Sequence, residues 1–134
     1  MLDSIIYPFV LQGFVIFTTL GILAHRRLGA IAKGETDVRY FKTFSGAGEP
    51  DYVRAAQRSF HNQFEMPVLF FAVCLAAVVF EKQTVWMVGA AWAYVVTRIL
   101  HTFIHLTRNK VLWRFRVFIL SNFFLLVMWI LLII

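Results

Sequence analysis

The sequence has little charge and a single cysteine, and both shortages limit what the chain can be. Charged residues make up 15% of its 134 positions, whereas 60% are hydrophobic and 17% are aromatic. This balance is too apolar for a soluble protein of this length, so we expect a single domain that lies in a lipid bilayer. The one cysteine, Cys74, lies within an apolar run, which excludes an internal disulfide.

Two further features are absent from the sequence. The net charge of +6 is not arranged as a basic patch interleaved with aromatic residues, so we expect no nucleic-acid partner. The N-terminal segment carries Asp3 in place of a positive region, and its apolar run is longer than that of a signal peptide. We therefore expect no cleavable signal. No internal repeat or second domain is evident either.

Four stretches lack charged residues altogether, namely 4–24, 66–80, 85–97 and 117–134. A helix needs roughly 20 residues to cross a hydrocarbon core of about 30 Å. The first and last stretches are nearly long enough to cross the membrane alone. The helices formed by the middle two must also include polar flanking residues. The sequence thus predicts an all-α, four-helix transmembrane bundle with spans at about 4–26, 53–80, 84–107 and 112–134. Pro67 predicts a kink or local break in the second helix.

The distribution of lysine and arginine predicts the orientation of the bundle. The basic residues of the first connection are Arg26, Arg27, Lys33, Arg39 and Lys42, and those of the last are Arg108, Lys110, Arg114 and Arg116. The middle connection has only Lys82. By the positive-inside rule, the first and last connections face the cytoplasm, and both termini lie on the non-cytoplasmic side. Residues 28–52, rich in glycine and charge, are predicted to form the first extramembrane loop.

Two rows of polar residues enter the predicted membrane region near its cytoplasmic side. The first row is Arg54, Arg58, His61 and Glu65, and the second is Tyr94, Arg98, His101 and His105. Both rows are spaced by four, three and four residues, which places each on one face of a helix. An ionisable side chain within a span costs roughly 2.5 to 3.5 kcal/mol on insertion scales, so we expect both rows to face a protein interior or a wet cavity.

The charges in these rows do not balance. An ion pair between Glu65 and Arg98 is one expected contact, but it leaves Arg58 and Arg114 without a counter-charge. The excess positive charge favours an anionic ligand, and the planar donors of arginine suit carboxylates in particular.

A metal site is an alternative use of the same rows. Its ligands would be His61, Glu65, His101 and His105, which suit zinc or iron. Because Arg58 and Arg98 lie on the same helix faces and would repel a cation, we expect no metal here.

Three motifs together resemble those of the MAPEG family, the membrane-associated proteins of eicosanoid and glutathione metabolism. The stretch RSFHNQFE at residues 58–65 is similar to the family pattern R-x-x-x-N-x-x-E on the second helix. The stretch RILHTFIH at residues 98–105 is similar to R-x-x-H-T-x-x-Y on the third. Arg114 follows nine residues after His105, at the position of the arginine that family transferases use to activate a thiol.

The resemblance implies a homotrimer of four-helix protomers with glutathione as cofactor, held between neighbouring subunits near the cytoplasmic face. The residues that would line the glutathione site are Arg26, Arg58, His61, Asn62, Glu65, Arg98, His101 and His105. Arg114 would hold the sulfur as a thiolate and is the implied catalytic residue. The function implied is that of a glutathione transferase or peroxidase, which acts on a lipophilic small molecule that arrives from the membrane lipids.

Some positions depart from the family pattern and leave a second function open. His105 stands where many members have tyrosine, Phe118 replaces a tyrosine found in some, and Phe115 supplies no hydroxyl beside Arg114. These losses favour the alternative of a non-enzymatic, lipid-binding or scaffold member of the family.

The sequence also bears on which membrane holds the chain. Residues 131–134 carry no retention signal, which favours a bacterial inner membrane over the endoplasmic reticulum.

Overall fold

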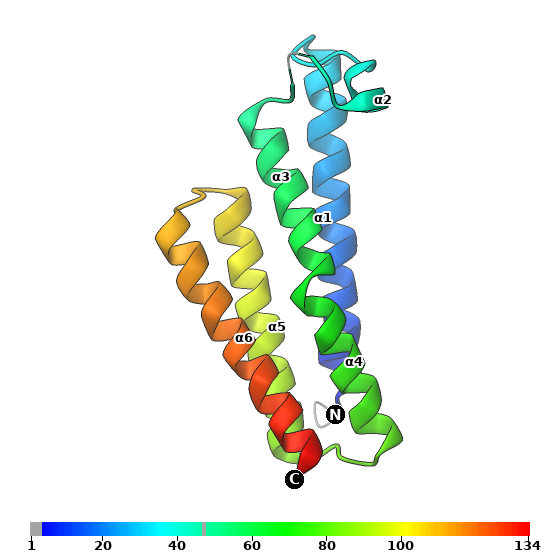
Figure 1. Cartoon of the computed structure of the whole chain (residues 1–134), viewed down its shortest axis with the longest axis vertical. Coiled ribbons are helices and arrows are strands. Elements are labelled where there is room, and N and C mark those ends of the chain that lie inside the picture. Colours follow the sequence, from blue (N-terminus) through cyan, green and yellow to red (C-terminus); the bar gives the residue numbers. More distant parts are fainter. Residues whose placement is uncertain (1–3, 47) are drawn as a thin grey trace.

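The computed structural model describes residues 4–46 and 48–134, and their main elements are helices. The α-helices are α1 (Ile6–Ala32), α2 (Tyr40–Thr43), α3 (Asp51–His61), α4 (Met66–Val79), α5 (Val85–Leu106) and α6 (Val111–Ile133), and a 3₁₀ turn, η1 (Asn62–Phe64), joins α3 to α4. Figure 1 shows the long helices side by side, with α3 and α4 following one another as a single interrupted rod. In the described part of the chain, four helical segments are long and apolar enough to cross a membrane.

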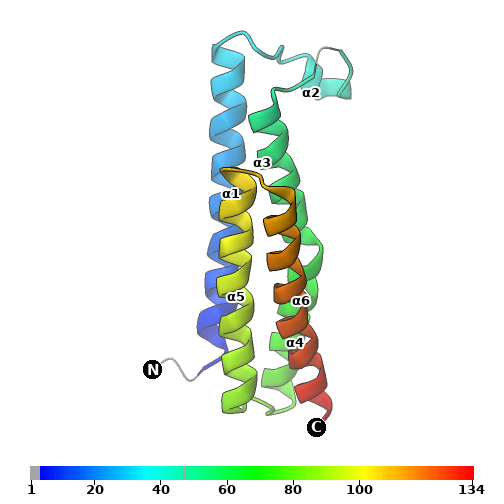
Figure 2. The same ribbon diagram turned by 90° about the vertical axis from the view of Figure 1, so that its left-hand side faces the viewer.

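The predicted all-helical bundle is therefore confirmed, and the chain is an integral, multi-pass membrane protein. The start of α1, the α4–α5 turn and the end of α6 lie at one end of the bundle in both views (Figures 1 and 2). The α1–α3 connection and the α5–α6 turn lie towards the other end. Large apolar side chains such as Phe17, Val79 and Ile119 are exposed on the outer faces, as expected where the solvent is lipid.

Two clusters of buried apolar side chains hold the helices together. The larger cluster lies among α4, α5 and α6, and within it the rings of Phe70 and Tyr94 stack with centroids 4.5 Å apart. The smaller cluster joins α1 to α3 through Leu23, Ala30 and Val53. Polar residues fill the level between these clusters.

The first helix is longer than the sequence predicted. Residues 28–32 were expected in the first loop but form the last turns of α1. Ala30 is 1% exposed and packs in the cluster that contains Val53, so this burial outweighs the weak helix propensity of Gly29. The predicted loop is wrong over these five positions.

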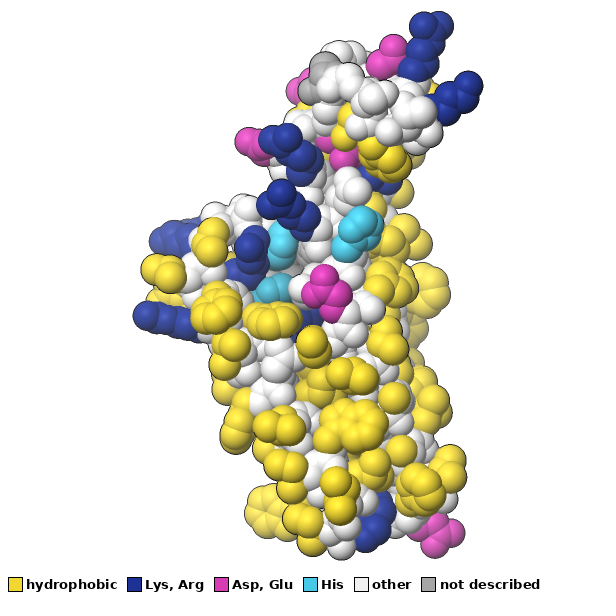
Figure 3. All heavy atoms as spheres, in the orientation of Figure 1, with side chains coloured by type: hydrophobic (Ala, Val, Ile, Leu, Met, Phe, Trp, Pro, Cys, Tyr) yellow, Lys and Arg dark blue, Asp and Glu magenta, His cyan; other side chains and the backbone are white. Residues whose placement is uncertain are grey.

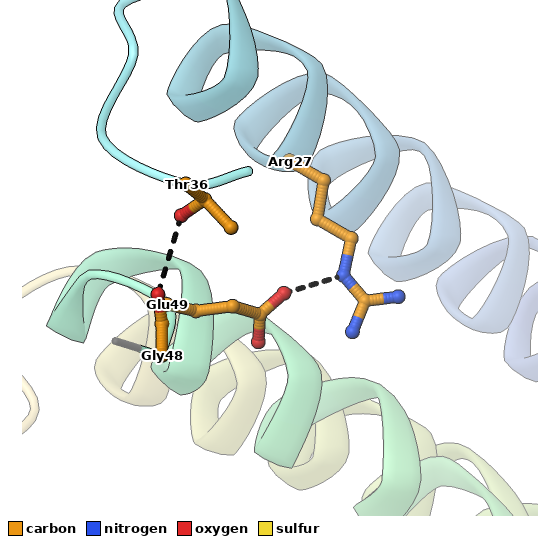
Figure 4. A network of polar contacts seen from close by, with 4 residues as sticks. All are labelled: Arg27, Thr36, Gly48 and Glu49. Carbon is orange, nitrogen blue, oxygen red and sulfur yellow. Dashed lines mark hydrogen bonds and ion pairs between the residues drawn. The ribbon is translucent and has the colours of Figure 1, made fainter. Parts of the chain in front are cut away.

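The rest of the loop is tied to the end of α1 and the start of α3 by polar contacts. Arg27 Nε donates to Oε1 of the buried Glu49 at 2.9 Å, and Thr36 Oγ1 donates to the carbonyl of Gly48 at 3.5 Å (Figure 4). The Arg27 guanidinium also lies 5.0 Å from the ring centroid of Phe41 in α2. These contacts hold the described part of the connection against the ends of α1 and α3.

The break predicted at Pro67 is confirmed, and it spans a whole turn. Pro67 has no N–H, and its ring would clash with the carbonyl of residue 63 in a continuous α-helix. The chain responds with the 3₁₀ turn η1 and with Glu65 outside the helical region, at φ −90° and ψ −98°. This turn carries Gln63 into the interior, where it accepts from Gln12 Nε2 at 3.1 Å and donates to Thr102 Oγ1 at 2.9 Å. The break therefore joins α1 and α5 through a buried polar chain.

Candidate functional site

The candidate site begins at Arg98, whose side chain is fully buried on α5. Its Nη2 donates to the carbonyl oxygen of Asn62 at 3.0 Å and to Asn62 Oδ1 at 2.6 Å. Asn62 Nδ2 in turn donates to Glu65 Oε2 at 3.0 Å. The expected ion pair between Glu65 and Arg98 is not found among the described residues, because Asn62 lies between the two side chains and bonds to both.

The buried guanidinium of Arg98 has fewer hydrogen-bond acceptors around it than it has donors. Its Nε and Nη1 have no hydrogen-bond partner among the described residues. Nδ1 of His101 and of His105 also lacks a partner in the described part of the chain. Buried polar groups are normally hydrogen-bonded, so several unpaired atoms on one face of α5 indicate a place where a polar ligand or water supplies the missing partners.

His101 and His105 continue the face of α5 that begins at Arg98. They are 3% and 5% exposed, and their ring centroids are 5.9 Å apart in an edge-to-face arrangement. The row predicted on the third helix therefore does face the protein interior.

Arg114 enters the site from α6. Its Nη1 lies 3.4 Å from His105 Nε2 and donates to Asn109 Oδ1 at 2.7 Å. Nη1 is the only nitrogen of this guanidinium with a hydrogen-bond partner among the described residues. The other two nitrogens remain able to bind a ligand.

A cavity of about 210 Å³ lies against His101 and Arg114. The lining residues are Asn62, His101, Val111, Arg114, Phe115 and Phe118. Its wall therefore combines a guanidinium, an imidazole and an amide with two aromatic rings. Such a cavity can hold the anionic, polar end of a small molecule and leave an apolar side open.

Arg58, His61 and Glu65 are exposed in the protomer, and they flank the chain segment that supplies the cavity residue Asn62. Figure 3 shows histidine, arginine and acidic side chains gathered on this face at mid-height, between apolar regions. The first row, Arg54 included, is therefore exposed in the protomer, contrary to the expectation that it faces the interior, whereas the second row is buried and His101 from it lines the cavity.

Arg26 lies apart from the other predicted residues. Its Nη1 and Nη2 donate to the carbonyls of Tyr52 and Leu106, both at 2.8 Å. It thereby satisfies a carbonyl at the C-terminal end of α5, where a cation is favoured. It also borders a separate apolar cleft of about 510 Å³ between α1 and α5. Within the protomer its role is to join α1, α3 and α5.

The metal alternative receives no support from the geometry. Among residues 4–46 and 48–134, no three His, Cys, Asp or Glu side chains are grouped so that they could hold a metal ion. His101 and His105 are buried, whereas His61 and Glu65 are exposed.

Asn109 is a site residue that the sequence did not single out. It has a φ of 44°, a left-handed conformation that asparagine tolerates better than most residues, and its N–H bonds to the carbonyl of Ile104 at 2.8 Å. Ending α5 in this way places its side-chain oxygen against Arg114. The signal available in the sequence was an asparagine in a short polar turn between two helices.

Comparison with known proteins identifies the family. The model of the MAPEG family matches residues 5–134, essentially the whole chain. The chain belongs to the MAPEG family. No curated protein matched the chain, and no solved structure matched it. Membership supports, at the level of the family, a membrane function related to glutathione, of the transferase or peroxidase kind or one akin to it. MAPEG proteins are generally oligomeric, and the exposed ionisable side chains next to the site are consistent with a further subunit there.

Proposed function

We propose that this MAPEG protein is a membrane glutathione transferase or peroxidase whose thiolate is stabilised by Arg114. The observation that carries the proposal is the cationic cavity itself. Arg114 lines this cavity with two guanidinium nitrogens unpaired, and no carboxylate is among the lining residues. The buried Arg98, also with two unpaired nitrogens, lies behind it and is hydrogen-bonded to the lining residue Asn62. Glutathione supplies two carboxylates, one ammonium and a thiol, which match such a donor set.

The residues divide the tripeptide's groups between them. The ammonium pairs with Glu65, whose carboxylate is hydrogen-bonded to the cavity residue Asn62, while the carboxylates of glutathione bind the arginines and the imidazoles. The unpaired nitrogens of Arg114 face the thiol and favour its charged, nucleophilic form. Phe115 lines the cavity and is also 60% exposed, which provides an apolar approach for a lipophilic acceptor from the bilayer.

We propose that three copies assemble around this site, with the α1–α3 connection and the α5–α6 turn in the cytoplasm. The exposed Arg58, His61 and Glu65 support the trimer, because ionisable side chains at membrane depth are costly unless a neighbour or a ligand covers them. On this assembly, Arg26 of one subunit can approach the site of the next. Native mass spectrometry of the detergent-purified protein, expected to give the mass of three chains, tests it.

The test of the function is glutathione binding, followed by thiolate formation in ultraviolet difference spectra. We expect binding and a thiolate signal in the wild type, and loss of the signal in Arg114→Ala. The matched control is Arg116→Ala, which removes an equal charge from the same helix. Arg116 is exposed and lies 5.3 Å from the ring centroid of Trp113, outside the cavity. A thiolate signal that survives Arg114→Ala would contradict the proposed role.

A second function is favoured by one observation. Phe118 lines the cavity, and its ring centroid lies 5.9 Å from that of His101, so this wall has no hydroxyl beside the place proposed for the thiol. This is the surface expected of a lipid-binding member without catalysis. Failure to bind glutathione at millimolar concentration, with retained binding of a fatty acid, would establish this alternative.

A further inference from the structure

The C-terminal part of the chain carries positive charge without any acidic residue. After Glu81 the sequence contains no aspartate or glutamate, and its basic residues are Lys82, Arg98, Arg108, Lys110, Arg114 and Arg116. Arg98 and Arg114 take part in the candidate site, and Arg116 lies over Trp113. Arg108 and Lys110 are exposed, and neither side chain has a hydrogen-bond or ion-pair partner among the described residues. Two cationic side chains without a neutralising partner among the described residues therefore lie on the α5–α6 turn.

A cleft lies directly beneath these two cations. Its volume is about 390 Å³, and it is lined by Phe103, Ile104, Thr107, Arg108, Lys110 and Trp113. It shares no lining residue with the candidate site, whose cavity opens on other faces of α5 and α6. Figure 3 shows lysine and arginine side chains projecting at the edge of the bundle where α5 turns into α6, with apolar side chains below them.

The cleft is polar at its rim and apolar along its wall. Arg108 and Lys110 form the rim, while Phe103, 63% exposed, extends the wall one turn down α5 towards the membrane interior. Trp113 is of the type found where a helix crosses the membrane–water interface. The order of these groups from the rim inwards, first basic, then aromatic, then apolar, matches the order of groups in a phospholipid from its phosphate to its acyl chain.

We propose that this cleft binds an anionic phospholipid from the leaflet on the side of the α5–α6 turn. Arg108 and Lys110 bind the phosphate and the anionic headgroup, and one acyl chain lies along Phe103 and Ile104. The site is separate from the glutathione site, and its occupation does not depend on thiol chemistry. Basic residues near an anionic bilayer surface each strengthen binding by about fivefold, so two give an effect that can be measured.

The experiment titrates delipidated, detergent-purified protein with phosphatidylglycerol or phosphatidylcholine, both with palmitoyl-oleoyl chains, and counts bound lipids by native mass spectrometry. We expect the wild type to retain one tight phosphatidylglycerol per chain and to bind phosphatidylcholine at least fivefold more weakly. Arg108→Gln with Lys110→Gln is expected to weaken phosphatidylglycerol binding by at least tenfold and to leave phosphatidylcholine binding unchanged.

The control pair is Arg39→Gln with Lys42→Gln, which removes the same charge from the other connection on this side of the bundle. Both residues are exposed, so neither pair is expected to disturb folding. An equal loss in the control pair would show general attraction of anionic lipid and overturn the site. Equal affinity for the two lipids, or displacement of the lipid by millimolar inorganic phosphate, would overturn it as well. A change in oligomeric state without a change in lipid binding would assign the cleft to a subunit contact instead.

Discussion

The bond between Asn62 and Arg98 gives the sharpest test of how the site is held together. Arg98 is 0% exposed, and both of its hydrogen bonds within the described residues go to Asn62, one to the main chain and one to the side chain. Asn62→Ala removes the side-chain acceptor at 2.6 Å and also the bond from Asn62 to Glu65. A lost hydrogen bond to a buried charged group costs about 1.5 to 3 kcal/mol, and the exposed bond adds about 0.5 to 1.

We therefore expect Asn62→Ala to lower the free energy of unfolding by about 2 to 4 kcal/mol, or the melting temperature by on the order of 10 °C. The assay uses the thiol of Cys74, which is 1% exposed and is the only cysteine of the chain. A fluorogenic maleimide reacts with it only when heating opens the bundle, so the reaction reports unfolding in detergent. Gln57→Ala, a change at a half-buried position of α3, is the control and is expected to stay within about 0.5 kcal/mol of the wild type.

The double variant Asn62→Ala with Arg98→Leu separates two causes of the lost stability, namely the missing hydrogen bond to Arg98 and the loss of side-chain packing at residue 62. With the guanidinium replaced by an apolar side chain, no buried charge is left without its acceptor, so part of the loss should be recovered. We expect an interaction free energy of at least about 1 kcal/mol between the two changes. Strictly additive effects, or a stable Asn62→Ala protein, would refute the argument that Asn62 compensates the buried charge.

Three further changes have defined outcomes. Asn109→Gly keeps the left-handed turn but removes the acceptor for Arg114, so on the proposed function kcat should fall about tenfold while the KM for glutathione stays nearly constant, and Asn109→Asp should restore most of the rate. Glu49→Gln removes the charge that pairs with Arg27, so limited proteolysis should cut the first loop faster while the reactivity of the buried thiol in the bundle stays unchanged. Gln63→Ala breaks two buried hydrogen bonds and should lower the free energy of unfolding by about 2 to 4 kcal/mol in the same thiol assay.

The parts of the site that could be predicted from the sequence are those that depend on periodicity within one unbroken helix. Arg98, His101 and His105 follow the three-and-four spacing of one face, and α5 runs without interruption from Val85 to Leu106. The cost of placing such side chains against lipid leaves only an interior position for that face. The burial of Arg98, His101 and His105 could therefore be predicted from their spacing and from this cost.

The row on the second helix could not be predicted in the same way. Its spacing from Arg58 to Glu65 was read on a continuous α-helix, but η1 and the non-helical Glu65 change the rotation between the two residues. Spacing also gives no sign of which face of a protomer meets a neighbour. Arg26 shows a related limit, because nothing in an arginine's sequence context says that its partners are two main-chain carbonyls from other helices.

The break before Pro67 connects the sequence to the site most directly. The carbonyl oxygen of Asn62 has two lone pairs, so it can accept from a side chain of α5 in addition to any bond within its own helix. At the break before Pro67 the chain turns so that Arg98 Nη2 donates to this carbonyl at 3.0 Å. The same turn presents the Asn62 side chain between Arg98 and Glu65 and sends Gln63 inward to Thr102. A local defect in one helix thus makes it possible to bury the cation of a neighbouring helix, with two of its nitrogens still unpaired.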